Sequence, residues 1–91
     1  EHAQHLHPND IPRFNKLGVI ASIQGIHLSS DRPWAINRLG RKRINQGSYA
    51  WNSLLESGAV VINGTDTPVE SINPIASFYS SVSRKKLDGV F

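Results

Sequence analysis

The sequence predicts an α/β fold in which parallel strands alternate with helices. Two apolar segments, Val19–Gln24 and Ala59–Ile62, are interpreted as buried strands. The second contains Val60-Val61-Ile62, a continuous β-branched run typical of a strand covered on both faces. Helical patterns flank each segment, and this alternation indicates βαβ units. Two or three strands cannot form a covered parallel sheet alone, so the pattern predicts that partner strands are missing from this chain.

A short amphipathic helix is predicted over residues 11–17. Pro8-Asn9-Asp10 is a helix-start signal, Gly18 is a stop, and apolar residues recur at helical spacing between them. The strand over residues 19–24 follows, and residues 26–30 are expected to form a loop.

Three further helices are predicted after that loop. Asp31 followed by Pro33 marks the start of the second helix, because proline is tolerated in a first helical turn, and Gly40 interrupts it. Gly47-Ser48 opens the third helix. The last helix begins at Asn73-Pro74, after the second strand and the loop that follows it.

The composition is that of one small globular domain over residues 1–91, with 38% hydrophobic and 19% charged residues. The chain has no cysteine, which excludes disulfides and thiolate metal sites. No apolar stretch approaches the roughly 20 residues of a membrane span. The net charge of +3 comes with two basic clusters, 38–43 and 84–86, which we interpret as solvated helix surface because aromatic residues lie elsewhere. We therefore expect no nucleic-acid and no membrane partner.

Three residues with metal-binding side chains share one predicted position, at or just beyond the end of a strand. These are His2, His27 and Asp66. In α/β proteins the carboxyl ends of parallel strands carry the chemistry. Imidazole and carboxylate are good ligands for zinc and similar divalent ions. Each residue alone is weak evidence, since Asp66 ahead of Pro68 also fits a turn and a lone histidine is more often a hydrogen-bonded surface residue.

Several blocks of the chain occur in an order known from one family. They are Glu1-His2-Ala3-Gln4, Leu17 to Gln24 with His27 after it, Asp31 to Ala35, Gly47 to Trp51 with Ser53 to Leu55, and Gly64 to Glu70. Together they resemble the C-terminal part of the amidohydrolase superfamily, and more closely its family 3, the YtcJ-like group. The resemblance covers essentially the whole chain. It implies a metal-dependent (β/α)₈ TIM barrel, of which this chain is expected to be a C-terminal fragment with about strands 6–8 and their helices.

The resemblance also implies roles for the three residues. His2 falls where the family has a metal ligand at the end of the sixth strand. Asp66 falls at the end of the eighth strand, where it is expected to bind metal and to act as general base. We assign His27 to substrate contact or transition-state polarisation. The family usually has proline where this chain has Gly25, in the loop that carries His27.

Other polar residues receive structural interpretations. His5 and His7 are taken as loop residues, Asp31 as a helix cap, and Glu70 as a residue that orders the loop after Asp66. The family's remaining metal ligands belong to earlier strands, upstream of Glu1. Catalytic zinc sites typically use three protein ligands, so two are expected to bind metal weakly and to support no hydrolysis in the isolated chain.

Two functions from different classes follow. The first is a metal-dependent hydrolase, with zinc as the expected ion, acting on C–N bonds of a small amide-type, non-peptide substrate and present here as a fragment inactive alone. The alternative is a non-catalytic small α/β protein that binds a partner or forms a homo-oligomer, which would cover its exposed strand edges. A nucleic-acid-binding module is a distant third, and it would bind less tightly as salt rises.

Overall fold

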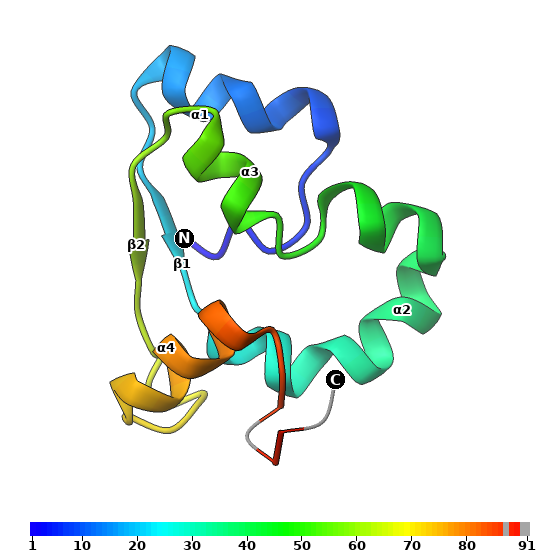
Figure 1. The fold of residues 1–91 in the computed structure, drawn as a ribbon, viewed down its shortest axis with the longest axis vertical. Coiled ribbons are helices and arrows are strands. Elements are labelled where there is room, and N and C mark those ends of the chain that lie inside the picture. Colours follow the sequence, from blue (N-terminus) through cyan, green and yellow to red (C-terminus); the bar gives the residue numbers. More distant parts are fainter. Residues whose placement is uncertain (87, 90–91) are drawn as a thin grey trace.

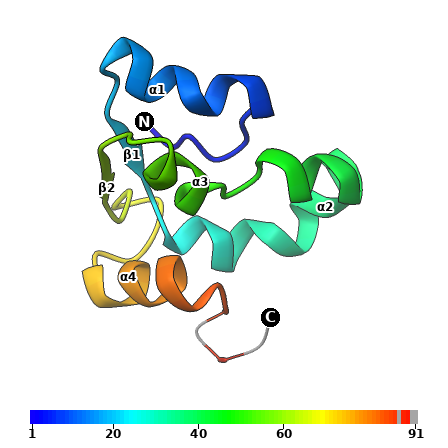
Figure 2. The ribbon, with the colours of Figure 1, turned by 45° about the horizontal axis from the view of Figure 1, so that its top comes forward.

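A computed structural model describes residues 1–86 and 88–89 of the chain. Its elements, in order, are the 3₁₀ turn η1 (Pro8–Asp10), α1 (Ile11–Leu17), β1 (Ala21–Ile23), α2 (Ile26–Gly47), α3 (Trp51–Glu56), β2 (Val61–Asn63) and α4 (Pro74–Ser83). The strands lie side by side, with α1 and α3 toward one end of the molecule and α4 toward the other (Figure 1; Figure 2). The predicted α/β class is confirmed, and strands and helices alternate as predicted. The third helix begins at Trp51 and not at Gly47, which is the last residue of α2.

The two strands form a parallel pair, with Ala21 opposite Val61 and Ile23 opposite Asn63. The opening residues form no third strand within the described chain; His5 makes only an isolated antiparallel bridge to Ser48. The second strand spans residues 61–63, so it begins and ends later than the predicted segment, residues 59–62.

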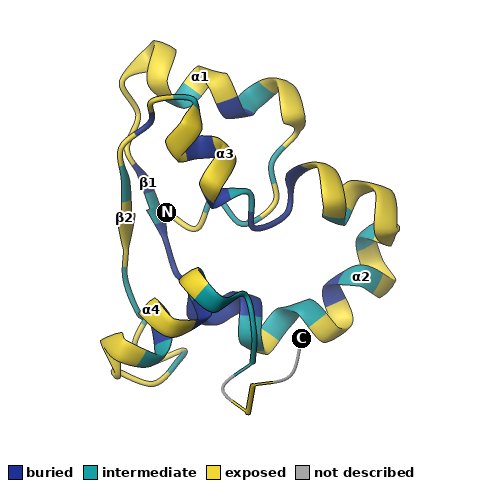
Figure 3. Ribbon diagram, in the orientation of Figure 1, coloured by how far each residue is buried: buried dark blue, intermediate teal, exposed yellow. Residues whose placement is uncertain are grey.

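The expectation that the second strand is buried on both faces is wrong for this chain. Val60 and Ile62 are 59% and 52% exposed. Val61, which points to the opposite face, packs against the hydrophobic core. Successive side chains of a strand point to opposite faces, so only the face that carries Val61 is covered. Figure 3 shows the resulting exposed stretch along β2.

Helix α2 begins at Ile26, so the expected loop over residues 26–30 and the helix start at Asp31 are both wrong. The first turn forms because Ile26 and Leu28 are buried, at 5% and 2% exposure, directly after β1. Asp31 therefore lies inside the helix, where its carboxylate accepts a hydrogen bond from Gln4 Nε2 at 2.8 Å, and it caps nothing. Gly40, with φ 77°, bends the helix at the predicted interruption (Figure 1).

Helix α4 packs closely on the start of α2 because small residues face the contact. Ser77 and Ser80 are 2% and 0% exposed. The Ser77 hydroxyl donates to the Gly64 carbonyl at 2.8 Å and accepts from the Ile26 amide at 3.3 Å. The backbone of Gly25 approaches α4 so closely that a Cβ there would collide with the Ser77 carbonyl and lie 2.7 Å from Ser81 Cβ. This packing fixes the turn from β1 into α2.

The core lies between the strands, α1, α3 and the first turn of α2. Its buried residues are Ile11, Ala21, Ile23, Leu28, Tyr49, Trp51, Leu54 and Ala59. At its edge, Arg84 donates to the Tyr49 carbonyl at 2.8 Å and lies 4.9 Å from the centre of the Trp51 ring. None of the helices in the described ranges combines the length and apolar character that a bilayer crossing needs.

Candidate metal centre

The fold brings His2, His27 and Asp66 together from three separate segments. Each offers one nitrogen or carboxylate oxygen, and these atoms all lie within 4.8 Å of one another. His27 is in the first turn of α2, Asp66 follows β2, and His2 belongs to the segment before η1. Because β1 and β2 are parallel, their carboxyl ends are adjacent, and the segments that follow them start side by side.

Backbone conformation directs two of the three side chains. His2 and Asp66 both have positive φ, at 69° and 56°. This left-handed region costs a residue with a side chain on the order of 1–3 kcal/mol, and such residues are concentrated at functional sites. Glycine would avoid that cost but would supply no ligand. Ala3, Tyr49 and Arg84 have positive φ as well, so this conformation directs the two side chains but does not by itself mark the site.

His27 is the buried centre of the cluster. Its side chain is 9% exposed, and Nε2 lies 3.0 Å from Asp66 Oδ2 while Nδ1 lies 3.2 Å from Glu70 Oε1. Both ring nitrogens thus face carboxylate oxygens. A neutral imidazole carries a single N–H and donates to one of them, whereas the imidazolium donates to both. The pair of carboxylates restricts how the ring is turned and where its proton lies.

Glu70 orders the loop after Asp66, as predicted, and it also reaches a residue that the sequence did not indicate. Its backbone amide donates to the Asp66 carbonyl at 3.2 Å. Its carboxylate oxygen Oε1, which faces His27, also accepts a short hydrogen bond from the Ser30 hydroxyl. No pattern in the sequence links Ser30 or His27 to Glu70, because 40 or more positions separate them.

The segment that carries His2 is held against β1 by its neighbour Glu1. The Glu1 carboxylate accepts hydrogen bonds from Ser22 Oγ at 3.0 Å and from Gln24 Nε2 at 2.8 Å. These two donors, Ser22 first, hold the pKa of Glu1 below its usual value because they stabilise the charged form. The His2 and His27 rings lie 5.7 Å apart, centre to centre. No sequence pattern indicates that Glu1 anchors the segment that carries His2.

His5 and His7 take no part in the cluster, as predicted. His5 Nδ1 lies 2.9 Å from Ser48 Oγ, and its ring meets the edge of Tyr49 at 5.4 Å between centres. His7 Nδ1 accepts from the Asn9 amide at 3.2 Å and caps η1.

The donor set fits a divalent metal ion. His2 and Asp66 supply an imidazole and a carboxylate, ligand types that zinc and similar ions prefer. Donor atoms about 2.0–2.2 Å from a tetrahedral ion are about 3.3–3.6 Å from one another. The 4.8 Å limit on the separations found here is wider, and the exposed His2 is the residue whose side chain would have to move closer.

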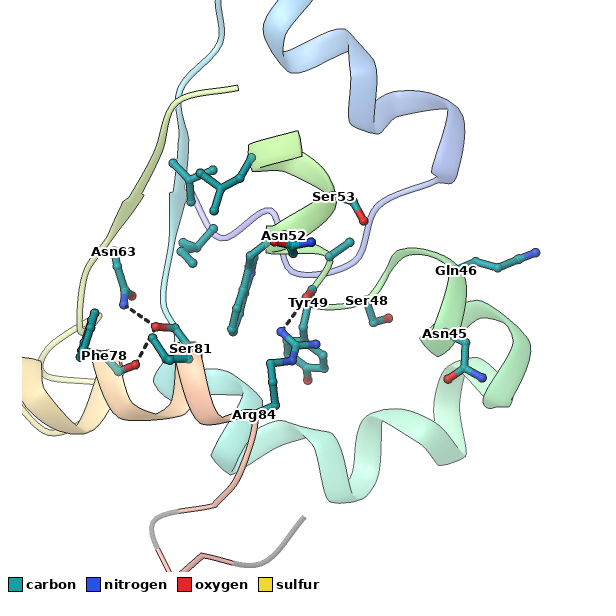
Figure 4. A pocket seen from close by; sticks show the side chains of 16 residues that line it. Asn45, Gln46, Ser48, Tyr49, Asn52, Ser53, Asn63, Phe78, Ser81 and Arg84 are labelled. Carbon is teal, nitrogen blue, oxygen red and sulfur yellow. Dashed lines mark hydrogen bonds between the residues drawn. The ribbon is translucent and has the colours of Figure 1, made fainter. Parts of the chain in front are cut away.

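A separate hollow of about 790 Å³ lies between the strands, α3 and α4. Figure 4 shows Asn63, Phe78, Ser81 and Arg84 around it, with Ser81 joined to Asn63. None of the three converging residues lines this hollow. Because it contains no cluster of catalytic or metal-binding side chains, we place the candidate chemistry at the strand ends.

Comparison with known proteins identifies relatives along nearly the whole chain. The model of a family described as "Amidohydrolase family" matches residues 1–90. Protein LONG AFTER FAR-RED 3 of Arabidopsis thaliana is 42% identical over 84 residues, which cover 92% of this chain and 14% of that protein. The putative amidohydrolase YtcJ of Bacillus subtilis is 34% identical over 84 residues, covering 92% of this chain and 16% of that protein.

Two crystal structures, each of an uncharacterized metal-dependent hydrolase, share the fold. The one from Pyrococcus horikoshii has a TM-score of 0.82 at 28% identity over 91% of this chain and 17% of its own. The one from Pyrococcus furiosus has a TM-score of 0.76 at 29% identity over 87% of this chain and 16% of its own. The chain thus corresponds to part of a larger hydrolase structure and spans 14–17% of the length of these four relatives.

Proposed function

The chain belongs to the amidohydrolase family, and from that premise we propose that it supplies part of the active site of a metal-dependent hydrolase. The reaction class is hydrolysis of C–N bonds in small amide-type, non-peptide substrates, with zinc as the ion. The observation that carries the proposal is the convergence of His2, His27 and Asp66 at the carboxyl ends of two parallel strands. In the proposed whole protein, this part is the region of strands 6–8 of a (β/α)₈ barrel, whose chemistry lies at that end.

His2 and Asp66 are the residues that would hold the ion. When bound, a divalent ion polarises a carbonyl oxygen and lowers the pKa of water. The Asp66 carboxylate would take a proton from the attacking water and pass it to the leaving nitrogen. Its side chain is 32% exposed, so a substrate approaching from solvent can reach it.

His27 would contact the substrate or stabilise charge that develops in the transition state. In the structure its Nε2 atom lies 3.0 Å from Asp66 Oδ2. The Asp66 carboxylate would therefore have to turn toward the ion before Nε2 could reach a substrate. The burial of His27 restricts its ring, and a fixed donor needs no reorganisation during the reaction.

The test compares two site variants with matched controls in the full-length natural protein. His2→Ala and Asp66→Asn should lose bound metal and abolish amide hydrolysis, with circular dichroism unchanged. His7→Ala and Asp10→Asn remove the same residue types from η1 and its cap and should alter neither property. Normal turnover in the Asp66→Asn protein would defeat the assignment. For the 91 residues alone, two ligands predict weak metal binding and no hydrolysis.

A second function, a non-catalytic module that forms homo-oligomers, is favoured by one observation. Large apolar side chains are exposed just before β2, on β2 and along α4, namely Val60, Ile62, Ile75, Phe78 and Val82. Such faces are costly in water and favour association. Light scattering on the 91-residue chain distinguishes the cases, because a cooperatively folded monomer would contradict the oligomer.

A further inference from the structure

We propose that Glu70 is a positioning residue that fixes the orientation of the His27 ring, so that Nε2 is directed at Asp66. This inference rests on the proposed function for its consequence in catalysis. The contact itself is a separate observation: Glu70 Oε1 lies 3.2 Å from His27 Nδ1, on the side of the ring away from Asp66.

The surroundings of Glu70 hold its carboxylate in place. The Ser30 hydroxyl donates to Oε1, the oxygen that faces His27. His27 and Ser30 lie three positions apart in α2, so their side chains project from the same face of the helix. The Glu70 amide donates to the Asp66 carbonyl, so one short segment carries both acids. Glu70 and His27 side chains are 20% and 9% exposed, which limits competition from water.

This arrangement restricts how the ring is turned. With Nδ1 facing Glu70 Oε1, Nε2 faces Asp66 and the proposed reacting centre. Without the Glu70 carboxylate, only Asp66 holds the ring, which can then rotate about its bond to Cβ. A carboxylate behind a histidine has this orienting effect in metal sites, where its removal typically costs about 10–100-fold in affinity or activity.

The experiment uses the full-length natural protein in three forms: Glu70→Ala, Glu70→Gln and the control Glu56→Gln. Glu56 is an exposed glutamate of α3 outside this network. Crystal structures of the variants report the orientation of the His27 ring. Metal content and the kcat and KM for amide hydrolysis are measured on the same samples.

We expect Glu70→Ala to let the His27 ring turn away from Asp66 and to lower kcat about 10–100-fold, with metal content retained. Glu70→Gln keeps an acceptor oxygen at the same place and should restore most of both properties. Glu56→Gln should resemble the natural protein. Circular dichroism establishes that each variant is folded, and Glu70→Gln keeps the test available should the alanine variant unfold.

Two results would overturn the inference: an unchanged orientation of the His27 ring in folded Glu70→Ala protein, or loss of metal equal to that of Asp66→Asn. The second would make Glu70 part of the metal site itself. If the natural protein binds no metal and cleaves no amide, the proposed function fails, yet the crystal structures still decide whether Glu70 orients His27.

Discussion

Replacing Gly25 with alanine tests the packing that leads from β1 into α2, where His27 lies. The residue has φ −59° and ψ −30°, a helical conformation that alanine adopts readily. On backbone grounds alone, Gly→Ala should stabilise by about 0.4–1 kcal/mol by restricting the unfolded chain. The contacts oppose this gain, because the new Cβ would collide with the Ser77 carbonyl and crowd Ser81.

Steric crowding outweighs the backbone gain, so the substitution should lower the stability of the protein. Overpacking of a close contact costs about 1–3 kcal/mol, and here the obstacle is the backbone of α4, which cannot rotate away. The net expectation is a loss of about 1–2 kcal/mol. Moving α4 outward would also strain the hydrogen bond from the Ile26 amide to Ser77 Oγ, at 3.3 Å.

Gly64→Ala is the matched control for this substitution. No atom lies within 4 Å of a Cβ built there, and its φ lies outside the left-handed region. The melting temperatures of both variants in the full-length natural protein give the answer. Gly25→Ala should melt below the natural protein, and Gly64→Ala at or above it. A Gly25→Ala protein as stable as the control would refute the close approach of α4.

Two further predictions concern the edge of the core. Arg84→Ala removes a charged donor from the Tyr49 carbonyl and a cation from the Trp51 ring. It should lower the free energy of unfolding, measured with urea, by about 1–3 kcal/mol. The control Arg38→Ala, at an exposed position of α2, should leave this free energy unchanged. Burial lowers the pKa of His5 below its ordinary 6.5, against an opposing influence of Asp31. The folded state therefore binds this proton less readily than the unfolded state, so the contribution of His5 to stability is present above pH 6.5 and is lost as pH falls through the folded pKa. The natural protein should lose more melting temperature between pH 8 and pH 5 than His5→Gln, and equal losses would contradict this sign.

The order of the elements was predictable because the signals that start, stop or bend a helix lie in the residues at that point of the chain. Gly18 ends α1 in a left-handed conformation, Asn73 caps α4, and Gly40 bends α2 as expected. The start of α2 was missed because its cause is tertiary. Asp31 and Pro33 form a plausible helix start, yet burial of Ile26 and the preceding turn place the start five residues earlier.

The sequence was enough to predict which residues lie at the candidate site, but it did not predict the hydrogen bonds between them. Position after a strand identifies His27 and Asp66, since parallel strands bring such positions together. The contacts of Glu70 with His27 and Ser30 depend on how the β2–α4 loop folds over α2, which no spacing encodes. The exposure of Ile62 was missed because a β-branched run indicates a strand without showing what covers it.

The most direct test of the metal centre is anomalous diffraction at the zinc absorption edge from crystals of the full-length natural protein. The account predicts a peak about 2.0–2.2 Å from an imidazole nitrogen of His2 and a carboxylate oxygen of Asp66, with Glu70 still bonded to His27 behind them. An ion held elsewhere, with His2 turned to solvent and Asp66 bonded only to His27, would contradict it.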